Sequence, residues 1–172
     1  MNVFFQLQRF SHSRLSWALL LGIVIFFEIC ALYFQHVMLL APCVMCIYER
    51  IAMLGIVGAA MVGLINPGNP ILRWLGFITW GFSAYKGLSL SLQHVDYQLN
   101  PSPFNTCDLF VTLPSWAPLN QWMPWMFEAY GDCSEISWQF LSLSMPQWLV
   151  VIFAANLLAL TMMVAVQFIK QK

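Results

Sequence analysis

The chain has 172 residues, of which 60% are hydrophobic and only 8% are charged, and its formal net charge is zero. Soluble domains carry about 25% charged residues, so this composition excludes a water-soluble globular protein. The sequence predicts an integral membrane protein with a single membrane domain over residues 1–172, and we expect no nucleic-acid partner.

Four apolar segments are long enough to cross a bilayer, which takes about 20 helical residues. They cover residues 16–34, 43–65, 71–92 and 148–169. The first segment also fits a cleaved signal peptide, but no clear small-residue cleavage site follows it, so we interpret it as a span. The predicted fold class is therefore an all-α membrane protein, an antiparallel four-helix transmembrane bundle.

The basic residues are unevenly placed, and their placement sets the orientation. One end of the predicted bundle carries Arg9, Arg14, Arg73, Lys170 and Lys172, whereas residues 93–147 hold five acidic residues and no Lys or Arg. The positive-inside rule predicts cytoplasmic termini. The loops at about 35–42 and 93–147 then face outward, which in a bacterial inner membrane means the periplasm.

The outer segment of about 55 residues is too long for a plain connection. Near its centre, Pro118 can open a short helix that presents Leu119, Trp122 and Met123 on one face. Tryptophan favours the headgroup level of a bilayer, so we expect this helix to lie on the membrane surface. The alternative is a loop packed on the helix ends.

Cys43 and Cys46 have the Cys-x-x-Cys spacing of redox, zinc and haem sites. If Pro42 occupies the first helical turn, Cys43 lies at the positive end of the helix, which stabilises a thiolate. Haem attachment is disfavoured because Ile47 stands where a histidine is needed. A zinc site that also uses Cys107 and Cys133 is formally possible, but their wide spacing and the oxidising compartment argue against it, so we expect no metal.

Cys107 and Cys133 lie in the outer segment, each after a flexible or extended stretch. The prolines of residues 100–106 favour an exposed, extended backbone that another protein can bind as a strand. Two cysteine pairs on one side suit disulfide exchange from pair to pair. A static Cys107–Cys133 bridge that merely closes a loop of about 25 residues is the alternative, and the residues alone leave both open.

Several motifs in register resemble one family. The chain resembles the disulfide bond formation protein B (DsbB) family, bacterial inner-membrane enzymes that reoxidise the periplasmic thiol oxidase DsbA with a quinone. The motifs, in chain order, are residues 34–40, 42–50, Pro101-Ser102-Pro103-Phe104, Thr106-Cys107-Asp108, Gly131-Asp132-Cys133 and residues 145–149.

The resemblance implies an electron path. A DsbA thiolate attacks the Cys107–Cys133 disulfide and bonds to Cys107, while Pro103 and Phe104 lie in the DsbA groove. The released Cys133 attacks Cys43, and Cys46 becomes a thiolate beside the quinone. The cofactor is then ubiquinone or menaquinone, and the partner is a DsbA-like thiol oxidase.

The same resemblance gives Arg50 and His94 as quinone-binding residues. Without it, Arg50 also reads as an interface residue paired with Glu49, and His94 as a solvated side chain. Gln35 and Gln98 are weaker candidates that support the nearby loop structure.

Three further residues lie within the predicted spans. We expect Glu28 and Lys86 to pair and join the first and third spans, since a lone charge there is costly. Cys30 is predicted to be a buried apolar filler. The alternative functions are a quinone-linked oxidoreductase similar to vitamin K epoxide reductase, and a non-enzymatic four-span binding protein with a disulfide-stapled loop.

Overall fold

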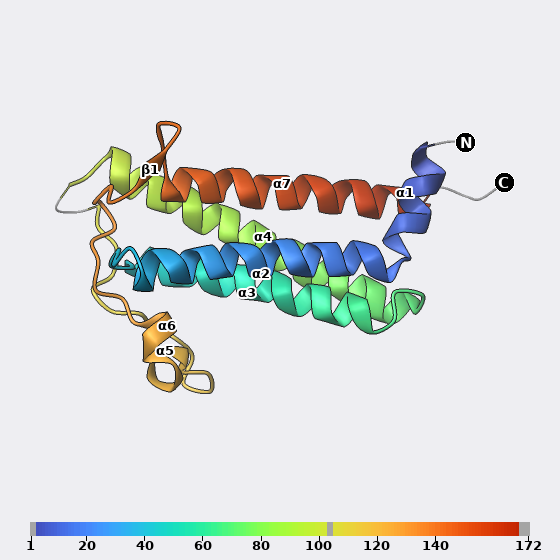
Figure 1. Cartoon of the computed structure of the whole chain (residues 1–172), viewed down its shortest axis with the longest axis horizontal. Coiled ribbons are helices and arrows are strands. Elements are labelled where there is room, and N and C mark those ends of the chain that lie inside the picture. The colour runs from blue at the N-terminus through green and yellow to red at the C-terminus, as the bar shows by residue number, and fades with distance from the viewer. Residues whose placement is uncertain (1–2, 103–104, 169–172) are drawn as a thin grey trace.

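The computed structural model describes residues 3–102 and 105–168. Four long helices of 21 to 30 residues dominate it: α2 (Arg14–His36), α3 (Val44–Ile65), α4 (Pro70–Leu99) and α7 (Met145–Ala165). Helix α3 contacts α2 and α4, and α4 contacts α7. Figure 1 shows that consecutive long helices run in opposite directions, side by side.

Three of these helices are long and apolar enough to cross a membrane within the described part of the chain: Arg14–His36, Val44–Ile65 and Met145–Phe168. This confirms a mostly helical membrane protein. Helix α4 is longer but more polar, because it carries Arg73, Lys86, His94 and Asp96. Its crossing of the membrane, and with it the four-span bundle, stays a prediction.

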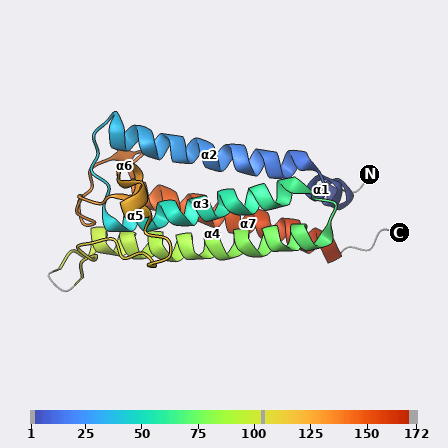
Figure 2. The same cartoon turned by 90° about the horizontal axis from the view of Figure 1, so that it is seen from below.

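The segments that connect the long helices lie at two opposite ends of the molecule. Helix α1 (Val3–Ser11), the α3–α4 turn and the 3₁₀ turn Val166–Phe168 share one end. The α2–α3 and α4–α7 connections share the other, as Figure 2 shows from a second direction. The N-terminal ends of α2 and α4, with Arg14 and Arg73, therefore lie opposite the end that holds Cys43.

Local signals start the long helices close to their predicted positions. The Asn69 side chain accepts the Ile71 N–H at 2.9 Å with Pro70 in the first turn, and the Ser144 N–H donates to Gln147 Oε1 at 2.8 Å. Helix α4 continues to Leu99, seven residues beyond the predicted end of the third span at Leu92, and the bounds of that span stay a prediction. The residues after Leu92 are polar but permit a helix until Pro101.

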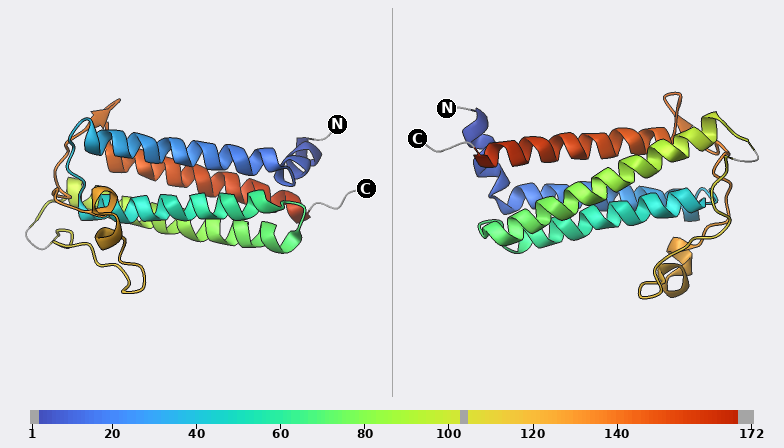
Figure 3. Two further views of the ribbon diagram at one scale, coloured as in Figure 1. Left: turned by 60° about the horizontal axis from the view of Figure 1, so that its bottom comes forward. Right: turned by 180° about the vertical axis from the view of Figure 1, so that it is seen from behind.

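Aromatic rings and glycines bring the helices together. Trp17 of α2 lies against Phe77 and Trp80 of α4, with ring centroids 5.2 and 6.3 Å apart. Helix α4 runs obliquely between its neighbours (Figure 3), and at Gly87 a Cβ atom would lie 2.2 Å from the Phe153 ring of α7. Glycine is thus required for this close helix contact, as is common between membrane helices.

The α4–α7 connection contains two single-turn helices and a small hairpin. These are α5 (Leu119–Trp122), α6 (Pro124–Phe127), β1 (Gln139–Phe140) and β2 (Leu143–Ser144). Phe127 is fully buried and the Trp125 carbonyl accepts from Gln35 Nε2 at 3.0 Å, so α6 is packed on the helix ends. Placement of this region on a membrane surface stays a prediction.

Candidate functional site

Cys43 and Cys46 lie at the start of α3. Cys43 is the N-cap, and its sulfur accepts the Cys46 N–H at 3.2 Å. Pro42 does not occupy the first helical turn, because the helix begins two residues later, at Val44. Cys43 still lies at the positive helix end, where a thiolate is stabilised. Both thiols are free, with Cys43 buried and Cys46 half-buried.

The second cysteine pair is held directly against the first. Cys107 and Cys133 form a disulfide, and Cys43, Cys133 and Met45 make one buried cluster. The N–H groups of Tyr130 and Gly131 both donate to the Pro42 carbonyl at 3.0 Å. The loop that carries Cys133 is therefore fixed by backbone contacts to the residue preceding Cys43.

Gly131 makes this approach possible. A Cβ atom there would lie 2.3 Å from the Ala41 carbonyl oxygen, and Gly131 pairs with Cys43 in an isolated parallel bridge. Any larger residue would push the Cys133 loop away from α3. Close to it, Asp132 accepts from the N–H and hydroxyl of Ser134, both at 2.9 Å, and these bonds lower the pKa of Asp132.

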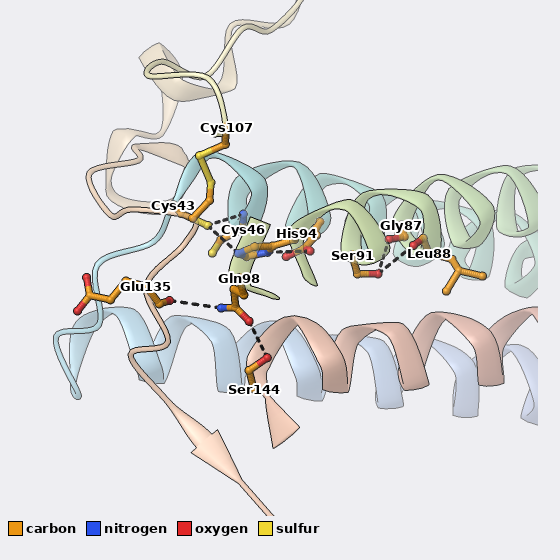
Figure 4. A network of polar contacts seen from close by, with 12 residues as sticks. Cys43, Cys46, Gly87, Leu88, Ser91, His94, Gln98, Cys107, Glu135 and Ser144 are labelled. Atoms are coloured by element: carbon orange, nitrogen blue, oxygen red, sulfur yellow. Dashed lines mark hydrogen bonds and ion pairs between the residues drawn. A yellow bond between two sulfur atoms is a disulfide. The ribbon is translucent and has the colours of Figure 1, made fainter. Parts of the chain in front are cut away.

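His94 of α4 links Cys43 to a buried carboxyl group (Figure 4). Its Nε2 atom lies 3.5 Å from Cys43 Sγ, and its Nδ1 atom lies 3.1 Å from Glu49 Oε1. His94 and Glu49 are 3% and 2% exposed. A neutral ring with its proton on Nδ1 donates to Glu49 and leaves Nε2 free to accept the Cys43 thiol proton.

An apolar cavity of about 360 Å³ opens beside Cys46, between α2 and α7. Aromatic side chains form much of its wall, among them Phe26, Phe34, Trp138 and Trp148. The polar groups on its wall converge near the sulfur: Cys46, Arg50, His94, Glu28, Glu49 and Gln35. An apolar cavity with a few convergent polar groups is typical of a small-molecule site.

Arg50 lies at the polar end of this cavity. Its Nη1 atom donates to Gln35 Oε1 at 2.7 Å and to the Met126 carbonyl, and its Nε atom lies 3.7 Å from Glu28 Oε2. Among the described residues, Nε and Glu28 Oε2 have no hydrogen-bond partner although both are buried. Such orphaned groups fit a ligand that carries hydrogen-bonding oxygens.

Several expectations are corrected by these positions. Glu28 pairs with Arg50 rather than with Lys86, whose side chain is exposed. Cys30 is half-buried on the cavity wall rather than a fully buried filler. The four-cysteine zinc alternative is wrong for this state, because Cys107 and Cys133 are bonded to each other.

Of the remaining candidate site residues, the structure describes Gln98. Gln98 donates to the Glu135 carbonyl at 3.3 Å and accepts from the Ser144 hydroxyl at 2.7 Å, so it joins α4 to the outer loop (Figure 4). Pro103 and Phe104, predicted to bind a partner, lie outside the described residues.

Sequence reasoning did not identify Glu49 as the partner of His94. The two residues are 45 positions apart, so only the packing of α3 on α4 brings them together. One signal was available: Glu49 follows Cys46 by three positions, which places both on one helix face.

Comparisons with known proteins agree on one family. The family model described as "Disulfide bond formation protein DsbB" matches residues 13–163. Disulfide bond formation protein B of Vibrio vulnificus is 71% identical over the full length of both chains. The proteins of that name from Vibrio cholerae and Aeromonas salmonicida are 70% identical over 99% of this chain and 98% of theirs, and 59% identical over 88% of each chain.

Proposed function

This chain belongs to the disulfide bond formation protein B family, and on that premise we propose how its own residues carry electrons from DsbA to a quinone. It is a membrane oxidoreductase that generates disulfides and reoxidises DsbA, in a family that is generally quinone-linked. The roles of individual residues, the kind of quinone and the orientation in the membrane are our proposals.

The first step is disulfide exchange at Cys107. A DsbA thiolate attacks the Cys107 sulfur, forms a mixed disulfide there and releases Cys133 as a thiolate. In our proposal Pro103 and Phe104 bind the DsbA groove. The exposed, largely irregular chain around Cys107 supports this assignment.

The second step moves the two electrons to the cysteine pair of α3. When Cys43 and Cys46 are joined, Cys133 attacks the Cys43 sulfur, forms a Cys43–Cys133 bond and expels Cys46 as a thiolate. The contacts of Tyr130 and Gly131 with the Pro42 carbonyl are the observation that carries the proposal, since they hold this loop at the attacked cysteine.

The second thiolate of DsbA then attacks the mixed disulfide, and DsbA leaves with its own disulfide formed. The released Cys107 thiolate attacks Cys133, which restores the Cys107–Cys133 bond and frees Cys43 as a thiol. Reduced Cys43 and Cys46, as this structure holds them, are the state that awaits oxidation.

His94 accepts the Cys43 proton at Nε2, and Glu49 keeps the ring in the required orientation. Arg50 stabilises negative charge that develops near Cys46. The bound quinone supplies the two-electron acceptor chemistry that restores the Cys43–Cys46 disulfide.

The cavity between α2 and α7 fits that acceptor. Its aromatic walls suit a ring and an apolar tail. Arg50, whose Nε has no hydrogen-bond partner among the described residues, suits a carbonyl oxygen. We propose ubiquinone or menaquinone, because both present these groups. The reduction potential of DsbA is about −120 mV, well above that of the glutathione pool. Glutathione disulfide therefore cannot reoxidise DsbA, and a more oxidising acceptor is needed.

In the proposed orientation, α4 is the fourth span, both termini are cytoplasmic and the cysteines face the periplasm. The exposed rings of Trp122 and Trp125 support a place for the α5–α6 region at the membrane surface.

A turnover assay tests the proposal. Purified protein in detergent is given reduced DsbA and ubiquinone or menaquinone, and quinone reduction is followed by absorbance. We expect one quinone reduced for each DsbA disulfide formed, no turnover by Cys46→Ser, and near-normal turnover by Ser89→Ala, which changes an exposed residue away from the cavity. Turnover that survives in Cys46→Ser contradicts the relay.

A further inference from the structure

Three metal-binding side chains converge at the reduced cysteine pair. The ligand atoms of Cys43, Cys46 and His94 all lie within 4.8 Å of one another. Two come from the first turn of α3 and the third from α4, so the packing of two helices fixes the group. A Cys₂His set with a free fourth position is a known zinc ligand combination.

One interatomic distance in the structure matches metal coordination directly. In a tetrahedral zinc site, with Zn–S of about 2.3 Å and Zn–N of 2.0–2.1 Å, the sulfur and nitrogen ligands lie about 3.6 Å apart. Cys43 Sγ and His94 Nε2 lie 3.5 Å apart. These two atoms therefore need almost no movement to share a cation.

The contact of the second ring nitrogen of His94 also fits a metal-binding histidine. A zinc-bound histidine commonly donates its second ring N–H to a carboxylate, which fixes the tautomer and strengthens the ligand. His94 Nδ1 lies 3.1 Å from Glu49 Oε1, and Glu49 Oε2 is buried with no hydrogen-bond partner among the described residues. Glu49 is thus a fixed, buried carboxyl group behind the ligand.

We propose that the reduced Cys43–Cys46 pair, together with His94, binds one soft divalent cation of the zinc and cadmium class. Each thiol loses its proton to water on binding, and no electrons move. The cavity beside Cys46 leaves room for a water as the fourth ligand. The nearby positive charge of Arg50 is compensated by Glu28, 3.7 Å away.

The site exists only in one redox state. Once Cys43 and Cys46 are joined in a disulfide, neither sulfur is a thiolate and the cation loses two of its three protein ligands. Conversely, a bound cation holds both sulfurs that must join again before the next transfer. Metal binding and disulfide transfer therefore exclude each other, and a soft cation acts as a reversible inhibitor of the reduced enzyme.

The binding experiment needs neither DsbA nor a quinone, so its result is separate from that of the turnover assay. A full-length variant with Cys30→Ala, Cys107→Ser and Cys133→Ser retains Cys43 and Cys46 as its cysteines. It is stripped of quinone, reduced, desalted without oxygen and titrated with Cd²⁺ while the thiolate-to-cadmium absorption is followed. Co²⁺ in a parallel titration reports tetrahedral geometry through its visible bands.

We expect one cation per chain and no binding after the pair is oxidised with diamide. Loss of the ligand in His94→Gln should weaken binding at least about 10-fold, and Glu49→Gln about 10-fold or more. His36→Gln, which changes an exposed histidine at the same end of the molecule, should leave the affinity unchanged.

Three results would overturn the proposal: no stoichiometric binding, binding that survives oxidation, or equal affinity in His94→Gln and the parent. Circular dichroism melting checks that each variant is folded. If His94→Gln fails to fold, Glu49→Gln decides in its place, and an unchanged affinity there counts against the site.

Discussion

Arg50 lies where the cavity, α2 and the α6 turn meet. It binds Gln35 and the Met126 carbonyl through one nitrogen and faces Glu28 with another. A planar group with several fixed donors suits this position, and lysine would not reproduce it. Arg50 thus connects the proposed quinone site both to α2 and to the outer loop.

Replacing Arg50 should weaken quinone binding specifically. The double variant Glu28→Gln/Arg50→Gln avoids leaving a buried unpaired charge. Its control is Lys86→Gln, which removes the charge of an exposed residue that does not line the cavity. A charge-assisted hydrogen bond contributes about 1.5–3 kcal/mol. We expect the quinone KM to rise about 10- to 100-fold with the KM for DsbA unchanged; an unchanged quinone KM in a folded double variant would exclude Arg50 from the site.

Sequence spacing predicted which side chains lie close together at the site. It did not predict which of them form ion pairs or hydrogen bonds with one another. The Cys-x-x-Cys motif and Arg50 share the first turns of one helix, so local spacing was enough. The Glu28–Arg50 and His94–Glu49 pairs join different helices. Which helix faces meet depends on packing, which a single sequence does not reveal, and the predicted Glu28–Lys86 pair was therefore wrong.

The loop that carries Cys133 is the element on which transfer depends. It reaches α3 through two backbone hydrogen bonds to Pro42 and through the close approach at Gly131. No apolar pattern marks such a contact in the sequence. In contrast, the long helices were predictable because crossing a bilayer requires about 20 apolar residues. The part of α4 beyond Leu92 is more polar, so the apolar pattern did not indicate it.

Gly131→Ala should slow transfer from Cys133 to Cys43. The added methyl would meet the Ala41 carbonyl at 2.3 Å, and relieving such overlap costs about 1–3 kcal/mol. If the loop moves away instead, turnover falls about 10-fold or more. The matched control is Gly58→Ala, where the new methyl meets nothing within 4 Å. Equal turnover of the two variants would show that the loop position is not limiting.

At the scale of the whole molecule, the helices separate two chemically different ends. Arg14 and Arg73 begin α2 and α4 at one end, and the cysteine pairs occupy the other. The family match confirms the resemblance found in the motifs, and it covers nearly the whole chain. The orientation rests on charge placement alone, so it needs its own test.

Labelling of single cysteines tests that orientation. In a chain without its native cysteines, Gly68→Cys lies in the exposed α3–α4 turn and Ser115→Cys in the exposed outer connection. A membrane-impermeant maleimide added to intact spheroplasts should label Ser115→Cys, and should label Gly68→Cys only after permeabilisation. The reverse pattern would place the redox site in the cytoplasm.

Mapping of a trapped intermediate tests the electron path most directly. Oxidised, quinone-depleted protein is mixed with a reduced DsbA variant that lacks its second cysteine, then alkylated and analysed by peptide mass mapping. The relay predicts DsbA bonded to Cys107, a Cys43–Cys133 disulfide and an alkylated Cys46. Recovery of an intact Cys43–Cys46 disulfide beside an alkylated Cys133 would contradict it.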